Sequence, residues 1–79
     1  MIKRKEWIKF VEVKDTGKTK IFEVYNKKHG GYGGQIRWYG GWRGYAYYPE
    51  NDSRYDSDWL YEVAEFIDRL MLQRKLKKL

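Results

Sequence analysis

The first third of the chain intersperses β-branched and aromatic residues with polar ones, which is a pattern typical of β-strands. Residues 6–14 and 19–26 both show it, and the four residues between them contain an aspartate that can open a turn and a glycine that tolerates a left-handed conformation. A first β-hairpin is therefore predicted over residues 6–26. If Val13 pairs with Lys20, one face of this hairpin, which we expect to be the core side, carries Trp7, Val11, Val13, Phe22 and Val24.

A second hairpin is predicted after a flexible connector, residues 27–34, that holds four of the eight glycines. Its strands are expected at residues 35–39 and 42–48, so that the hairpin covers residues 35–48. Between these strands lies a glycine pair, and a two-residue type I′ turn needs positive φ at both central positions. The glycine pair therefore predicts a tight two-residue turn.

The length of this turn decides which side chains of the second hairpin are exposed. A two-residue turn pairs Tyr39 with Trp42, and the faces then follow from the two-residue period of a strand. The core side is expected to carry Ile36, Trp38, Tyr45 and Tyr47, and the outer side Gln35, Arg37, Tyr39, Trp42, Gly44, Ala46 and Tyr48. A three-residue or bulged turn would exchange half of these assignments.

An amphipathic helix is predicted from about residue 57 to residue 76. Pro49 ends the preceding strand because it cannot donate a ladder hydrogen bond, and Asp56 and Asp58 suit the N-cap and the positive end of the helix dipole. Apolar residues then recur at helical spacing at Trp59, Leu60, Val63, Ala64, Phe66, Ile67, Leu70 and Met71. The predicted fold is α+β, a four-stranded antiparallel meander with one C-terminal helix on one face. The other face is left to solvent or to a partner.

Composition narrows the function classes. The 79 residues suffice for one domain, residues 1–79, with basic ends that we expect to fray. The chain has no cysteine and one histidine, His29, so a thiolate or zinc site is excluded, and we expect neither an enzyme nor a cofactor. No stretch approaches the roughly 20 apolar residues of a membrane span. We therefore expect a cytoplasmic protein.

Aromatic residues make up 19% of the chain, and the net charge is +6. Arginine beside aromatic residues on an open sheet is typical of surfaces that stack bases and contact phosphates, but also of protein-binding hot spots. The cations, however, are concentrated in residues 1–29 and at the C-terminus, not in the second hairpin. Both partners, protein and DNA or RNA, therefore remain open, as does a homodimer. The candidate binding residues are Tyr32, Arg37, Tyr39, Trp42, Arg43, Tyr48, Lys27 and Lys28.

Residues 36–49 and 60–67 carry the patterns W-Y-x-x-W-x-x-Y-x-x-x-P and L-x-x-x-A-x-F-I. Through these two patterns, roughly residues 33–70 resemble a group of small uncharacterised proteins from phages and prophages. It departs from their pattern at Gly41, where a proline is common, and in the extra glycines of residues 30–34. The resemblance implies a small mobile-element protein that acts as an inhibitor or accessory factor, binding a host protein or nucleoprotein complex involved in nucleic-acid handling or defence.

Overall fold

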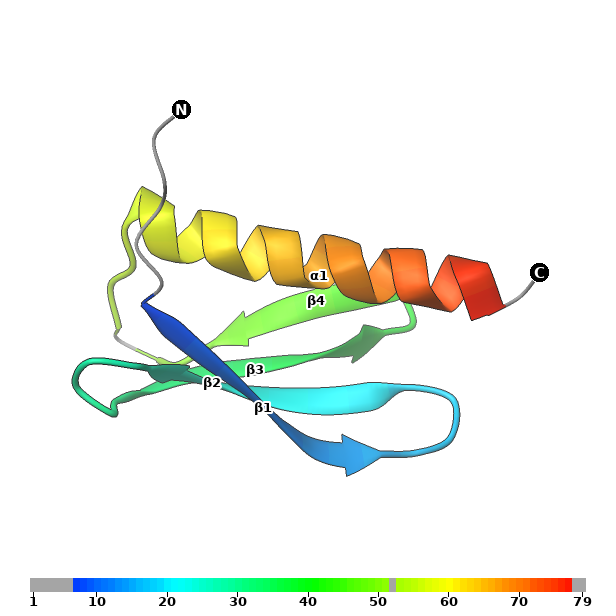
Figure 1. The fold of residues 1–79 in the computed structure, drawn as a ribbon, viewed down its shortest axis with the longest axis horizontal. Coiled ribbons are helices and arrows are strands. Elements are labelled where there is room, and N and C mark those ends of the chain that lie inside the picture. The colour runs from blue at the N-terminus through cyan, green and yellow to red at the C-terminus, as the bar shows by residue number, and fades with distance from the viewer. Residues whose placement is uncertain (1–6, 52, 78–79) are drawn as a thin grey trace.

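Four antiparallel strands form a single sheet, and one helix covers one of its faces (Figure 1). The computed structural model describes residues 7–51 and 53–77. The strands lie in the sheet in sequence order, so each strand pairs with its neighbours in the chain. This confirms the predicted α+β meander with its C-terminal helix. The elements are β1 (Ile8–Asp15), β2 (Lys20–Asn26), β3 (Tyr32–Tyr39), β4 (Gly44–Pro49) and α1 (Ser57–Lys77).

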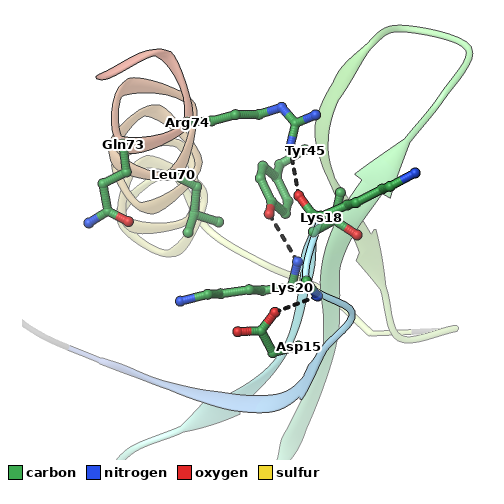
Figure 2. A pocket seen from close by; sticks show the side chains of 9 residues that line it. Asp15, Lys18, Lys20, Tyr45, Leu70, Gln73 and Arg74 are labelled. Carbon is green, nitrogen blue, oxygen red and sulfur yellow. Dashed lines mark hydrogen bonds between the residues drawn. The ribbon is translucent and has the colours of Figure 1, made fainter. Parts of the chain in front are cut away.

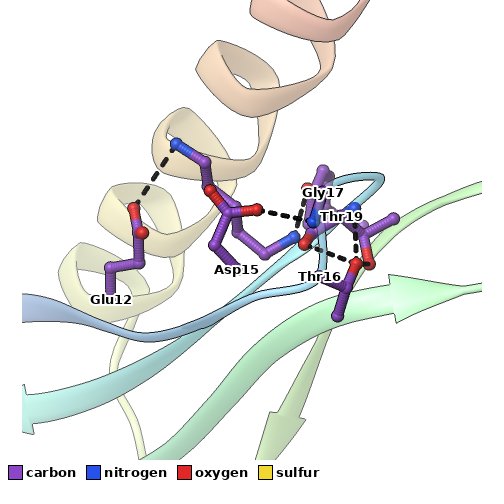
Figure 3. A network of polar contacts seen from close by, with 7 residues as sticks. Glu12, Asp15, Thr16, Gly17 and Thr19 are labelled. Carbon is purple, nitrogen blue, oxygen red and sulfur yellow. Dashed lines mark hydrogen bonds and ion pairs between the residues drawn. The ribbon is translucent and has the colours of Figure 1, made fainter.

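The loop between β1 and β2 is held by its own polar groups (Figure 3). The Gly17 amide donates a hydrogen bond of 2.8 Å to the Asp15 carboxylate, and Gly17 has a φ of 87°. On the other side of the loop, the Thr19 amide donates to Thr16 Oγ1 at 2.9 Å. The predicted roles of the aspartate and the glycine are confirmed, because one provides the local acceptor and the other the left-handed conformation.

The pairing of β1 with β2 differs from the predicted pairing by one residue. Phe10 pairs with Val24, and a β-bulge at Val13 shifts the register towards the loop. Ile8 and Phe10 therefore face α1, whereas Val11 lies on the opposite face and Val13 is 48% exposed. The expectation that Val11 and Val13 belong to the core is wrong. The three other residues of that set, Trp7, Phe22 and Val24, lie in the core or pack against it.

The larger side chains of β1 explain this register. Phe10 stacks on Phe66 of α1, with ring centroids 4.0 Å apart and an interplanar angle of 4°. Ile8 is 6% exposed. Burying an isoleucine and a phenylalanine removes more apolar surface from water than burying two valines, so the observed pairing gains more from the hydrophobic effect.

A loop of four residues, rather than two, joins β3 to β4. Tyr39 pairs with Gly44, so the predicted pairing of Tyr39 with Trp42 is wrong by two residues. The loop is closed by hydrogen bonds of 3.2 Å from Trp42 N to Tyr39 O and from Arg43 N to Gly40 O. Because strand faces alternate with a period of two, a shift of two leaves the β3 and β4 side chains on their predicted faces. Trp42 itself leaves the strand and lies in the loop.

Much of the glycine-rich segment belongs to a strand and not to a flexible connector. β3 begins at Tyr32, three residues before the predicted start. Gly33 forms a bulge against α1, where a Cβ atom would overlap the ring of Trp59. Gly34 has a φ of 114°, and a Cβ there would overlap the carbonyl oxygen of Tyr48 in β4. These glycines are needed because other groups approach the backbone closely at both positions.

α1 starts where predicted because Asp56 caps it, accepting a hydrogen bond of 2.9 Å from the Trp59 amide. The helix side facing the sheet completes the core, whose buried residues are Ile8, Phe22, Val24, Ile36, Trp59, Val63 and Leu70. Trp38 was expected in this core but is half-buried. It lies at the margin of the covered face, where the Arg74 guanidinium sits 4.2 Å from its ring centroid.

α1 extends to Lys77, one residue beyond the predicted end. The basic ends predicted to fray are residues 3–5 and 74–78; residues 3–5 and 78 lie outside the described residues, whereas residues 74–77 belong to α1. In the part of the chain that the structure describes, no helix has the length and apolar character that crossing a membrane requires.

Candidate functional site

No element among the described residues lies over the sheet face opposite α1, and we call this surface the open face (Figure 1). Half-buried aliphatic side chains and partly exposed aromatic side chains share it. The strand register places on it Val11, Ile21, Tyr25, Tyr32, Arg37, Tyr39, Ala46 and Tyr48, and the β3–β4 loop adds Trp42. The surface thus combines the residue types that are enriched in protein interfaces with an apolar floor.

Trp42 is the most exposed large apolar side chain that the structure describes, at 77%. Its ring is nevertheless held in place, because it meets the ring of Tyr39 edge to face, with centroids 4.8 Å apart and an interplanar angle of 73°. Aromatic pairs of this geometry contribute about 0.5–1.5 kcal/mol beyond their area burial. The pair therefore presents a large aromatic surface whose position is fixed before any partner binds.

Arg37 lies between the two ends of the open face. Its guanidinium sits 4.7 Å from the ring centroid of Tyr48, in a cation–π contact between β3 and β4. Arg37 is exposed, and stacking on a ring leaves the guanidinium N–H groups able to donate hydrogen bonds in the plane of the group. The contact orients a cation that can bind a carboxylate or a phosphate.

Two tyrosines occupy the other end of the open face, where their rings lie 5.6 Å apart. The Tyr25 hydroxyl donates a hydrogen bond of 2.8 Å to Glu23, and this bond raises the pKa of Tyr25. Partial burial, followed by the charge of Glu23, raises the pKa of Tyr32. Both hydroxyls stay neutral at physiological pH, and this end of the face is polar without a net positive charge.

The candidate binding residues fall into separate groups along β3. Tyr39, Trp42 and Arg43 lie at one end, and Arg37 with Tyr48 lies in the middle. Tyr32 lies at the other end, about 23 Å from Tyr39 for an extended strand of this length. The turn before Tyr32 carries Lys27 and Lys28, and the Lys28 ammonium sits 5.5 Å from the ring centroid of Trp7. The structure thus does not bring the two lysines to Trp42.

Sequence reasoning missed three side chains of the open face, namely Val11, Ile21 and Tyr25. Val11 was assigned to the core because the register of the first hairpin was one residue off. Ile21 and Tyr25 follow from the alternation of β2, because Phe22 and Val24 were correctly assigned to the core side, and Tyr25 lies next to Tyr32 across the strands. The bulky pair Ile8 and Phe10 was the sequence signal that could have identified this register.

A cleft of about 380 Å³ separates the β1–β2 loop from the C-terminal part of α1 (Figure 2). Arg74 reaches across it and donates a hydrogen bond of 2.7 Å to the Lys18 carbonyl. On the sheet side, the Lys20 amide donates to the Tyr45 hydroxyl at 3.0 Å, and the Lys20 ammonium pairs with Glu12 at 3.4 Å. Arg74 and Lys20 are thus already engaged. The hydrogen bond from Arg74 to Lys18 connects the β1–β2 loop to α1 across the cleft.

Within residues 7–51 and 53–77, no group of three or more histidine, aspartate or glutamate side chains could hold a metal ion. His29 is exposed in the β2–β3 turn. Comparisons of the chain with protein-family models, with curated proteins and with solved structures gave no match.

Proposed function

We propose that this chain is a non-enzymatic binding module that docks on a protein partner through its open face. The observation that carries the proposal is Trp42, which is 77% exposed and yet held against Tyr39 on the face that α1 leaves uncovered. A fully exposed tryptophan is unfavourable in water, and tryptophan, tyrosine and arginine are enriched among interface residues that dominate binding energy.

The mixed character of the open face favours a protein over a nucleic acid. Lys9, Lys14 and Arg37 are its cations on the strands, and Glu23 lies among them. Half-buried aliphatic side chains lie on this face between the charged ones. A phosphate backbone that crossed the face would require further cations at these positions. An apolar floor with Tyr, Trp and Arg around it matches the composition of interface cores in protein complexes.

The charges also indicate the kind of partner. Arg37, Arg43 and the two lysines of β1 favour a partner surface with carboxylates, because opposite charges speed association and fix orientation. The resemblance to phage and prophage proteins is consistent with a host protein, or a nucleoprotein complex, that handles nucleic acids or takes part in defence. The chain would then act as an inhibitor or accessory factor in the host cytoplasm.

The test compares Trp42→Ala with Leu72→Ala, which removes a side chain that is 56% exposed on α1, away from the open face. Immobilised chain is incubated with a nuclease-treated host lysate, and retained proteins are quantified. We expect Trp42→Ala to lower the affinity for a stoichiometric partner by at least about 30-fold, corresponding to 2 kcal/mol, while the melting temperature falls by only a few degrees through loss of the ring pair with Tyr39. Equal retention by both variants would contradict the proposal.

The second candidate function is direct binding of DNA or RNA, with bases stacked on Tyr39 and Trp42 and phosphates on Arg37 and Arg43. The pairing of Trp42 with Tyr39 favours it, since exposed aromatic rings can stack on bases of any sequence. Fluorescence polarisation with short single- and double-stranded DNA and RNA tests it directly. Affinity that falls steeply with salt and depends on Trp42 would favour this function over the protein interface.

A further inference from the structure

A groove of about 460 Å³ lies at the end of the molecule where the β2–β3 turn meets the start of α1. This end is opposite the loops that join β1 to β2 and β3 to β4 (Figure 1). Four aromatic residues line the groove, Trp7, Tyr32, Tyr55 and Trp59, and its polar lining residues include Asn26, His29, Arg54 and Asp56. Its volume lies within the range of small-molecule sites.

The aromatic walls of this groove are fixed by contacts inside the protein. The ring of Tyr55 stacks on Trp59 with centroids 5.0 Å apart and an interplanar angle of 24°. The Tyr55 hydroxyl donates a hydrogen bond of 3.0 Å to the carbonyl oxygen of Gly33. Tyr32 is 40% exposed at the rim, and Trp7 is half-buried. A planar ring of a ligand can therefore stack on preformed aromatic surface.

Among the charged side chains that line the groove, Arg54 carries a positive charge and Asp56 a negative one. Arg54 is exposed and makes no ion pair or hydrogen bond with the residues that the structure describes. His29 is exposed nearby, and the Lys28 ammonium lies over the ring of Trp7. The one carboxylate in the wall, that of Asp56, is engaged with the Trp59 amide. Arg54 is therefore the charged group of the lining that remains available, and a guanidinium favours an anionic ligand such as a phosphate.

Asn26 adds a directional group. Its side-chain oxygen accepts hydrogen bonds from the amides of Lys28 at 2.9 Å and His29 at 2.8 Å. These bonds fix the orientation of the side chain and leave its amide N–H groups as donors at a residue of the groove lining. Such donors suit the ring nitrogens and carbonyl oxygens of a nucleobase.

We propose that this groove binds a nucleotide, with its base on the aromatic walls and its phosphate at Arg54. Both features are required, since the walls provide stacking and the cation provides recognition of the phosphate. The nucleotide is either free or the terminal unit of a single strand. The groove shares Tyr32 with the open face but lies at the other end of β3 from Trp42, so substitutions at Arg54 and at Trp42 test the two proposed contacts separately.

The test titrates AMP, adenosine, ribose 5-phosphate and choline while following tryptophan fluorescence and amide NMR shifts. We expect AMP to shift the Gly31 amide and the Trp59 indole, and to bind at least tenfold more tightly than adenosine or ribose 5-phosphate. Equal binding of adenosine would overturn the role of the phosphate, and equal binding of ribose 5-phosphate would overturn the role of the stack. Preferential binding of choline would overturn the proposal entirely.

Arg54→Glu is the diagnostic variant, and Arg69→Glu, at an exposed position of α1, is its matched control. Both make the same charge change at an exposed position, so thermal melting should show that both fold. We expect Arg54→Glu to weaken AMP binding at least tenfold and Arg69→Glu to change it less than twofold. Equal weakening by both variants would show that net charge, and not this groove, attracts the nucleotide.

A 5′-phosphorylated deoxyadenosine trinucleotide distinguishes the two sources of the nucleotide. If the groove takes a strand end, the trinucleotide should bind at least tenfold more tightly than AMP at 50 mM salt and lose this advantage as salt is raised. Equal affinities support a free nucleotide. Absence of NMR shifts at the groove with both AMP and the trinucleotide would overturn the proposal, whatever the open face binds.

Discussion

The two faces of the sheet both carry aromatic residues, but they use them differently. On the face covered by α1, Trp59 is 7% exposed, and its indole N–H donates a hydrogen bond of 3.0 Å to the Tyr47 hydroxyl. That hydroxyl donates in turn to the carbonyl oxygen of Gly33, and burial raises the pKa of Tyr47. On the open face, Trp42 is 77% exposed and contacts Tyr39 through its ring.

This contrast shows that aromatic content does not by itself distinguish a core from a binding surface. The two tryptophans Trp59 and Trp42 differ in whether the ring is buried and its indole N–H bonded inside the protein. Where hydroxyl and indole groups bond to each other inside the protein, the aromatic residues hold the fold together. Trp42 and Tyr39 pair through their rings and are 77% and 40% exposed, so these side chains remain available to a partner.

The largest effect is expected from Trp59→Ala. The substitution leaves a cavity between α1 and the sheet and removes the partner of the Tyr47 hydroxyl, so it should cost about 3–5 kcal/mol of unfolding free energy. A domain of this size has a stability of only about 4–12 kcal/mol, so this loss removes a large part of it. Urea denaturation measures the loss. A cost below about 1 kcal/mol would remove the distinction between the two faces.

Gly34→Ala tests the sheet that both faces share. The added Cβ overlaps the Tyr48 carbonyl, and the φ of 114° is unfavourable for any residue except glycine. We expect a cost of about 3 kcal/mol. Gly40→Ala is the matched control, because a Cβ there meets no atom within 4 Å, and it should change stability by less than about 0.5 kcal/mol. Similar melting temperatures for both variants would contradict the close approach of β3 and β4.

Trp38→Ala probes the margin of the covered face. Trp38 is half-buried, and its ring meets the ring of Tyr45 edge to face with centroids 5.5 Å apart. The Arg74 guanidinium lies 4.2 Å from the Trp38 ring centroid. Losing these contacts should cost about 2 kcal/mol, which destabilises the protein without unfolding it at 25 °C. Calorimetry should place this variant between Trp59→Ala and Trp42→Ala. A loss as large as that of Trp59→Ala would mean that the core extends to this margin.

The smallest effect is expected from Arg43→Gly. Arg43 has a φ of 53° in the β3–β4 loop, a conformation that costs most residues about 1 kcal/mol and glycine little. The variant should therefore gain about 0.5 kcal/mol, or about 3 °C in melting temperature. If the open face binds an acidic surface, the same variant should bind its partner more weakly. Gain of stability without loss of binding would exclude Arg43 from the interface.

Much of the fold could be predicted because strand and turn signals are local. Asp15, Gly17, Pro49 and Asp56 each act on neighbouring backbone, and each was placed correctly. The strand register depends on contacts across the sheet and was predicted incorrectly in both hairpins. Whether a register error moves a side chain to the other face depends on whether the shift is an odd or an even number of residues. An error of one residue in the first hairpin moved Val11 to the wrong face, whereas an error of two in the second hairpin kept every strand residue on its face.

The open face was predictable in part for the same reason, since Arg37, Tyr39 and Tyr48 follow from the alternation of β3 and β4. Trp42 was expected on the outer side, but its position depends on the turn length. The aromatic groove was not predictable, because its walls come from residues 7, 32 and 55, which lie far apart in the sequence. The sheet brings Trp7 and Tyr32 to the same end of the molecule, and the segment that leads into α1 adds Tyr55, so no local pattern encodes the groove.

The sequence-ordered arrangement of the strands also has a consequence for how quickly this chain folds. Each strand finds its partner across a short loop, so sheet formation needs little loop-closure entropy, and folding rates rise as contacting residues lie closer in sequence. α1 is the last element of the chain, and Trp59, Val63 and Leu70 must dock before the core is complete. On a ribosome, the hairpins would therefore emerge with their apolar face exposed until the helix has been synthesised.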